Sequence, residues 1–114
     1  MSESTPYVDH NGDIIWKNAK GQCHRLDGPA IDRADGSKAW YVNGKLHRLD
    51  GPAIEYDDGT KEWWVNDKRH RLDGPAYEGA DGSKLWWVEG WTYAEERWRQ
   101  KVAELLADKK KNNE

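Results

Sequence analysis

Short runs of apolar residues alternate with polar turn residues along most of the chain. In the central part, residues 52–56 and 61–65 are rich in β-branched and aromatic residues, and turn residues bound each run. The turn signals are the Asp-Gly pairs at 35–36, 58–59 and 81–82, and Asn43-Gly44. Gly accepts the positive φ that tight hairpin turns require, so these pairs favour hairpins. The pattern therefore predicts a series of β-hairpins.

The hairpins are separated by a block of seven residues, His-Arg-Leu-Asp-Gly-Pro-Ala, that occurs three times unchanged. The copies occupy residues 24–30, 47–53 and 70–76, so the period is 23 residues. A fixed period in this range is typical of a repeat array. In each block we expect Asp, Gly and Pro to set a turn and His to brace it. The residues assigned to this structural role are His24, Asp27, Gly28, His47, Asp50, Gly51, His70, Asp73 and Gly74.

A degenerate first unit precedes these three blocks. Its Asn11-Gly12 pair matches the Asp-Gly pair of the next unit at an offset of 24 rather than 23. One extra residue therefore lies between Trp16 and His24, and we expect it in the loop from Asn18 to Gln22. Terminal repeats are commonly atypical because they cap the array. The predicted organisation is a flexible N-terminus at 1–6, repeats at about 7–28, 29–51, 52–74 and 75–91, a helix at 92–108 and a basic, polar tail at 109–114.

The last segment changes to helical periodicity. Thr92 and Glu95 form a capping-box pattern at its start. Apolar residues then recur at helical spacing, at Ala94, Trp98, Val102, Leu105 and Leu106. We expect this helix to pack on the last hairpin and cover a sheet edge. The predicted fold is mainly β: an open antiparallel meander of about four hairpin units, closed by a C-terminal amphipathic helix.

The period also aligns aromatic residues into two columns. The first column is Trp16, Trp40, Trp63 and Trp86, and the second is Tyr41, Trp64 and Trp87. Neighbouring residues of a strand point to opposite faces, so the sheet carries aromatic side chains on both sides. One column can form the core while the other binds a partner, although all eight Trp could instead be core. The partner-binding prediction is Trp40, Tyr41, Trp63, Trp64, Trp86, Trp87, Arg48 and Arg71.

Composition narrows the classes of protein that fit. The mean hydropathy of −1.14 is low, but eight Trp and five Tyr supply a large apolar area that such scales score as polar. The net charge of −3 argues against a dedicated nucleic-acid-binding protein. Cys23 is the only cysteine, which excludes an intrachain disulfide. No run reaches the ~20 apolar residues of a membrane span and no signal peptide is visible, so we expect a soluble, cytoplasmic protein without membrane contact.

Candidate chemistry is sparse. Equivalent His residues in neighbouring units would lie roughly 10–14 Å apart, too far to ligate one zinc ion. Ser37 and Ser83 occupy turn positions without a nucleophile elbow, and no Gly-rich phosphate loop opens a helix. We expect no enzyme activity, no cofactor and no metal. Single-stranded nucleic-acid or nucleotide binding stays open, because aromatic residues interleave with basic ones at Arg25, Arg48, Arg71, Lys38, Lys61 and Lys84.

The repeated unit resembles a known family. Its Asp-Gly turn, Trp-Trp-Val or Trp-Tyr-Val strand and His-Arg-Leu-Asp-Gly-Pro-Ala block are similar to MORN-like (MORN-variant) hairpin repeats, especially those of small repeat proteins encoded by bacteriophages, bacteria and large viruses. The resemblance covers residues 12–100. It implies an elongated, curved β-meander with an interaction role. The Gly- and Tyr-rich pattern of the standard MORN unit is not followed, so lipid binding is not implied.

These observations favour a non-enzymatic protein–protein interaction module. The resemblance includes proteins encoded by phages, and with a phage origin we expect an inhibitor that sterically blocks a bacterial host (defence) protein in the host-cell cytoplasm. The alternative is binding of single-stranded nucleic acid or a nucleotide through the Trp, Tyr, Arg and Lys side chains. A homodimer formed through a sheet edge is also open.

Overall fold

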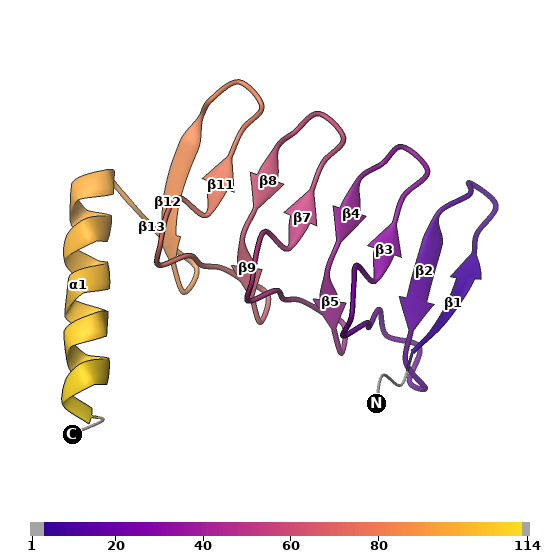
Figure 1. The fold of residues 1–114 in the computed structure, drawn as a ribbon, viewed down its shortest axis with the longest axis horizontal. Helices are drawn as coiled ribbons and strands as arrows, with labels where there is room; N and C mark the ends of the chain where they lie inside the picture. The colour runs from indigo at the N-terminus through magenta and orange to yellow at the C-terminus, as the bar shows by residue number, and fades with distance from the viewer. Residues whose placement is uncertain (1–3, 113–114) are drawn as a thin grey trace.

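An open, nine-stranded antiparallel sheet dominates the computed structural model, which describes residues 4–112 (Figure 1). The strands follow one another in chain order, so the sheet is a meander, and one helix closes its C-terminal end. The predicted fold class is confirmed. The strands are β1 (Thr5–Val8), β2 (Ile14–Lys17), β3 (Ile31–Asp32), β4 (Lys38–Ala39), β7 (Ile54–Glu55), β8 (Lys61–Glu62), β11 (Tyr77–Glu78), β12 (Lys84–Val88) and β13 (Trp91–Tyr93).

Two short ladders lie outside this sheet. They pair β5 (Tyr41–Val42) with β6 (Lys45–Leu46), and β9 (Trp64–Val65) with β10 (Lys68–Arg69). The predicted run 61–65 is therefore split at Trp63, and the reason is a change of backbone partner. The Trp63 N–H donates to the Ala76 carbonyl, whereas its own carbonyl accepts from the His70 N–H. Trp63 is thus the junction between the main sheet and the short ladder.

Each hairpin is closed by the turn that its residues favour. In the long hairpin of β3 and β4, the Arg33 N–H donates to the Ser37 carbonyl at 2.8 Å, and Gly36 has a φ of +97°. This is a three-residue loop that ends in a left-handed Gly. The short ladder of β5 and β6 has two central residues with positive φ instead, Asn43 and Gly44. Both turn signals of the repeat are used, one at each end of the unit.

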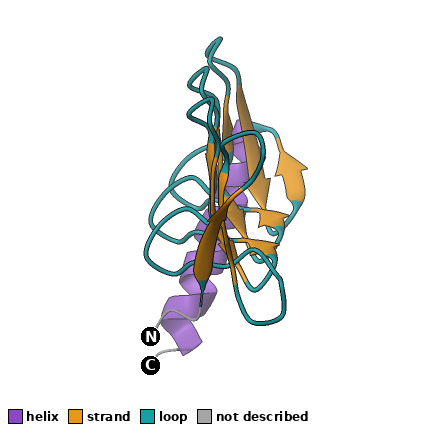
Figure 2. Cartoon of the chain, turned by 90° about the vertical axis from the view of Figure 1, so that its right-hand side faces the viewer, coloured by secondary structure: helices purple, strands orange, loops and turns teal. Residues whose placement is uncertain are grey.

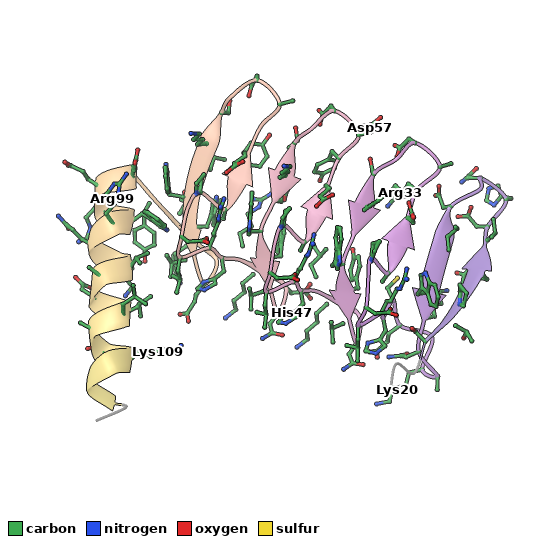
Figure 3. The ribbon with its side chains drawn as sticks, viewed as in Figure 1. Lys20, Arg33, His47, Asp57, Arg99 and Lys109 are labelled. Atoms are coloured by element: carbon green, nitrogen blue, oxygen red, sulfur yellow. The ribbon has the colours of Figure 1, made fainter. Side chains whose placement is uncertain are left out.

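The molecule is a flat, elongated plate with principal extents of 47 × 38 × 17 Å. Arg33 and Asp57 mark the end of the sheet where the long hairpins turn, and His47 and Lys20 mark the opposite end (Figure 3). Seen along the array, loops are stacked behind one another on one side of the sheet, and short strands lie on the other (Figure 2). Such a thin plate leaves many residues of the repeat within reach of solvent.

The N-terminal edge of the sheet is strand β1, whose four residues are all exposed. Pro6 lies opposite Trp16, and the Trp16 N–H donates away from β1, to the Ala30 carbonyl. Pro6 therefore faces the free edge with its nitrogen, which has no hydrogen to donate. Proline in this position discourages further strand pairing. The predicted flexible segment 1–6 is wrong for Thr5 and Pro6, which belong to β1, and residues 1–3 lie outside the described part.

The C-terminal edge is covered by α1 (Glu95–Asn112), which contacts β12 and β13 (Figure 1). The predicted capping box is wrong. Thr92 lies in β13 opposite Trp87, and the first helical hydrogen bond runs from the Trp98 N–H to the Ala94 carbonyl. Strand pairing to the last hairpin outcompetes a local cap at this threonine. The helix also continues through Asn112, so most of the predicted tail 109–114 is helical, and residues 113–114 lie outside the described part.

The buried core is small and has two parts. Ala30, Ala53 and Ala76, one from each block, are completely buried. The second part is an apolar cluster beneath α1, formed by Val88, Trp98 and Val102, with Leu72, Trp86, Tyr93 and Leu105 packed against it. No helix within residues 4–112 is long and apolar enough to cross a bilayer.

Candidate protein-binding face

The histidine of each block pins the following unit. Nδ1 of His24 accepts the backbone N–H of Asn43, 19 residues later, at 2.9 Å. The same bond recurs between His47 and Asn66 at 3.1 Å and between His70 and Glu89 at 2.9 Å. Each donating N–H belongs to the first left-handed residue of the next short turn. Burial lowers the pKa of His70, which favours the neutral, accepting form of the ring.

The arginine of each block clamps a tryptophan. The Arg48 guanidinium lies 3.8 Å from the centre of the Trp40 ring. Its Nε donates to Asp50 at 3.0 Å and its Nη1 to the Pro52 carbonyl at 3.0 Å, so its plane is fixed. The other blocks repeat this Arg–Trp clamp with Arg25 over Trp16 at 4.1 Å and Arg71 over Trp63 at 3.8 Å. Arg25, Arg48 and Arg71 could have bound phosphate, but each guanidinium is already paired with an aspartate and stacked on a tryptophan.

Glycine and alanine leave the space that this clamp needs. A Cβ on Gly51 would lie 3.0 Å from Cζ of Arg48, closer than a side chain tolerates without displacing the guanidinium. Ala53, two residues later, has no exposed surface, so a larger residue would not fit. His, Arg, Gly and Ala of the block therefore have clear structural tasks.

The leucine of the first two blocks has no such task. Leu26 is 60% exposed and Leu49 is 80% exposed, although both occur in a block that is repeated without change. Beside them stand the carboxylates of Asp27 and Asp50, with side-chain exposures of 75% and 88%. The hydrogen bond from Arg25 lowers the pKa of Asp27, so its carboxylate is ionised at neutral pH.

Two grooves separate the three loops formed by the blocks. Groove A has a volume of about 550 Å³ and lies between residues 24–30 and 47–53; Trp40 and Val42 line it together with Leu26 and Leu49. Groove B, of about 490 Å³, lies one unit further along; Trp63 and Val65 line it together with Leu49 and Leu72. Leu49 therefore borders both grooves. We call the block loops and these two grooves the loop face.

The third equivalent position on the loop face is closed by α1. Shifting the groove B residues Leu49, Trp63 and Val65 by one unit of 23 gives Leu72, Trp86 and Val88. These three residues belong to the apolar cluster under α1, and Val88 is only 1% exposed.

The stacking partner also changes at this position. A residue 23 positions after Arg71 would be Ala94, which cannot form the Arg–Trp clamp. The Trp98 ring takes the place of the guanidinium, with its centre 4.6 Å from that of Trp86. Nε1 of Trp98 also donates to the Arg71 carbonyl at 3.0 Å. The helix thus completes the last unit in place of a fourth block.

The aromatic residues predicted to bind a partner are all at least half-buried. In the first column, Trp40 and Trp63 lie under Arg48 and Arg71, and Trp86 lies under α1. The second column alternates with the residues that line the grooves, so its members point to the other side of the sheet. They are Tyr41, Trp64 and Trp87, and they too are partly covered. Neither column presents a bare row of indole faces.

A buried carboxylate organises the second column in the third unit. Glu62 is 6% exposed and accepts from the Tyr56 hydroxyl at 2.9 Å and from Nε1 of Trp64 at 2.9 Å. Arg69 pairs with it at 3.1 Å and lies about midway between two indoles, 5.0 Å from the Trp64 ring and 5.2 Å from that of Trp87. Burial and the bond to Glu62 raise the pKa of Tyr56. This cluster is specific to one unit.

The next unit shows what happens without the carboxylate. Its equivalent of Glu62 is Leu85, whose side chain has no atom that could accept a hydrogen bond. Nε1 of Trp87 is buried and is the one such side-chain nitrogen or oxygen without a hydrogen-bond partner in the part of the chain that the structure describes. The second column is therefore held together by different chemistry in successive units, whereas the loop face is built alike in each.

Within residues 4–112 no three His, Cys, Asp or Glu side chains come together in a way that could hold a metal ion. Comparison with protein-family models, with curated proteins and with solved structures finds no match. The site must therefore be interpreted from its own chemistry.

Sequence reasoning missed Leu26, Leu49 and the grooves, although an apolar residue kept unchanged inside every turn was a usable signal.

Proposed function

We propose that this protein is a non-enzymatic module that binds a partner protein on its loop face. One observation carries the proposal: Leu26 and Leu49 are exposed in blocks that are otherwise fully used by the fold. A leucine on a turn gains nothing from folding when it stays in water. Burying it against a partner is worth about 1.5–3 kcal/mol, and neighbouring grooves allow several such contacts at once.

The chemistry of the rim favours a protein over a nucleic acid. The exposed charges beside the leucines are carboxylates, which repel phosphate. The arginines of the blocks are only 19–23% exposed at their side chains, and each is bonded to an aspartate. Binding of single-stranded nucleic acid is therefore the weaker candidate. The more specific form, a phage-encoded inhibitor that occludes a bacterial protein, rests on the resemblance in sequence.

The proposal can be tested by capture from bacterial lysate. The bait would be the full chain, the double variant Leu26→Ser/Leu49→Ser, or the control Leu106→Ser, which alters a leucine on α1 that is 51% exposed. Such surface changes alter stability by only about 0.5 kcal/mol. We expect the double variant alone to lose the captured protein, which is then identified by mass spectrometry, purified and titrated. Equal affinity of that purified partner for all three baits would refute the proposal, as would capture of nucleic acid instead, seen as a raised A260/A280 ratio.

A further inference from the structure

We propose that the loop face accepts a basic amphipathic α-helix of the partner, which lies across the block loops and places large apolar side chains seven residues apart into grooves A and B. This inference rests on the proposed function and specifies its occupant. Three independent features of the molecule support it: the way α1 covers the third position, the spacing of the grooves, and the charge of the rim.

The chain itself packs a helix against the same combination of residues at the third position, at the C-terminal end of the array. At the third position, Leu72, Trp86 and Val88 are covered by Trp98, Val102 and Leu105 of α1. These helix residues follow one another at i, i+4 and i+7, the pattern of anchors in helix-in-groove recognition. At grooves A and B the equivalent residues meet the next block loop instead, and the grooves between the loops are open. A helix is thus the element already used to bury this combination of leucine, tryptophan and valine.

The spacing of the grooves selects the same element. Each unit adds two strands to the main sheet, so equivalent positions lie roughly 10 Å apart at about 4.8 Å per strand. Residues seven apart in a helix are separated by about 10.5 Å and lie nearly on one face. Residues three apart in an extended strand cover a similar length, but they point to opposite faces. A strand therefore cannot fill both grooves with this step.

The negative charge at the edges of the grooves determines which residues suit the partner helix beside its apolar anchors. Asp27, Asp50 and Asp73 expose 75–88% of their side chains, whereas their arginine partners are mostly covered. Lysine or arginine beside the apolar anchors would complement these carboxylates and orient the helix.

Grooves A and B differ from the third position in one respect. Arg48 and Arg71 lie over Trp40 and Trp63, where Trp98 lies over Trp86. An anchoring side chain would therefore contact the leucine, the valine and the outer side of the guanidinium rather than the indole. A guanidinium plane stacks on aromatic rings, so aromatic anchors suit these grooves.

The test uses synthetic lysine-rich helical peptides, labelled with fluorescein, and the full-length protein. One peptide carries two Trp at i and i+7; its matched control has the same composition with the two Trp at i and i+5, about 140° apart around the helix. Fluorescence anisotropy should show at least tenfold tighter binding of the first peptide. Leu49→Asp, which alters both grooves, should abolish that preference, and Leu106→Asp should leave it unchanged. Circular dichroism checks the fold of each variant, with Leu49→Ala as a milder substitute.

Equal affinity for the two peptides, or binding that ignores Leu49→Asp and Leu49→Ala, would overturn the inference. Tighter binding of a proline-rich peptide with anchors at i and i+3 would overturn it too, because that ligand is a polyproline helix. The lysate experiment separates the two proposals. If capture requires Leu26 and Leu49 while the peptides are not distinguished, the interaction function stands and the helical occupant is wrong.

Discussion

Trp98→Ala is the most informative single substitution in the molecule, because Trp98 is the main anchor of α1. It is 6% exposed, stacks on Trp86, and donates its Nε1 hydrogen to the Arg71 carbonyl. In a repeat array each unit contacts only its neighbours. We therefore expect the variant to release α1 and to leave the first three hairpin units folded.

The magnitude follows from these contacts. Replacing a buried tryptophan by alanine costs about 3–5 kcal/mol, and the carbonyl of Arg71 loses a hydrogen bond worth about 1 kcal/mol. Of the remaining anchors on α1 only Val102, which is 8% exposed, is buried, and its burial contributes at most about 1.5–3 kcal/mol. Most of the stability of a helix in a protein comes from the packing of its apolar face, and this holds for the 18 residues of α1. The stabilisation lost with Trp98 therefore exceeds the stabilisation that Val102 still provides, and we expect α1 to undock.

Hydrogen exchange resolved along the chain measures this directly. The amides of α1 should exchange at least tenfold faster in Trp98→Ala, whereas those of β3, β4, β7 and β8 should keep their protection. Trp91→Ala is the matched control, because Trp91 lies in β13, which α1 contacts, but is 72% exposed. Unchanged protection of α1 would refute the anchoring role of Trp98. Equal loss of protection throughout the chain would refute the modular reasoning.

Two further substitutions test the contacts between and within units. His70→Asn keeps an acceptor for the Glu89 N–H but does not titrate. Burial lowers the pKa of His70 below 6.5, so the stability that this group contributes is present above that pH and is lost as the pH falls through the lowered pKa. The urea midpoint of the wild type should therefore fall more between about pH 7.5 and pH 5 than that of the variant; identical slopes would contradict this. Glu62→Leu should destabilise the protein by about 2–4 kcal/mol in urea unfolding, because it leaves Tyr56, Trp64 and Arg69 without their acceptor. Glu62→Gln, which still accepts one bond, should cost less, and equal losses would show that hydrogen bonding is not the cause.

Local signals in the sequence predicted much of the architecture. The 23-residue period, the Asp-Gly turns and the final apolar stripe each depend on residues close together in the chain, and each appears in the structure. The start of the helix was not predictable in this way. Thr92 suits a helix cap and a strand equally well, and the pairing with Trp87 that decides between them is set by tertiary contacts.

The candidate site was harder to predict for a related reason. Trp40 and Arg48 look like exposed interface residues in the sequence, but the clamp between them uses the arginine to cover the ring. Whether the Trp40 ring is exposed or covered depends on where the loop that carries Arg48 runs. Leu49 was not among the predicted site residues: its presence in every block is a signal, but its 80% exposure is seen only in the structure. The sequence alone does not show which side of each block loop faces solvent.

The histidine that pins each following turn makes the length of this protein adjustable in whole units. His47 serves its neighbour in the same way as His24 does, so a duplicated copy of residues 47–69 would find the same partners on both sides. Pro6 would still protect one edge and α1 would still close the other. Each added copy would lengthen the loop face by one step of roughly 10 Å and contribute one more groove. Gene duplication could thereby change the valency of the protein without any new fold having to arise.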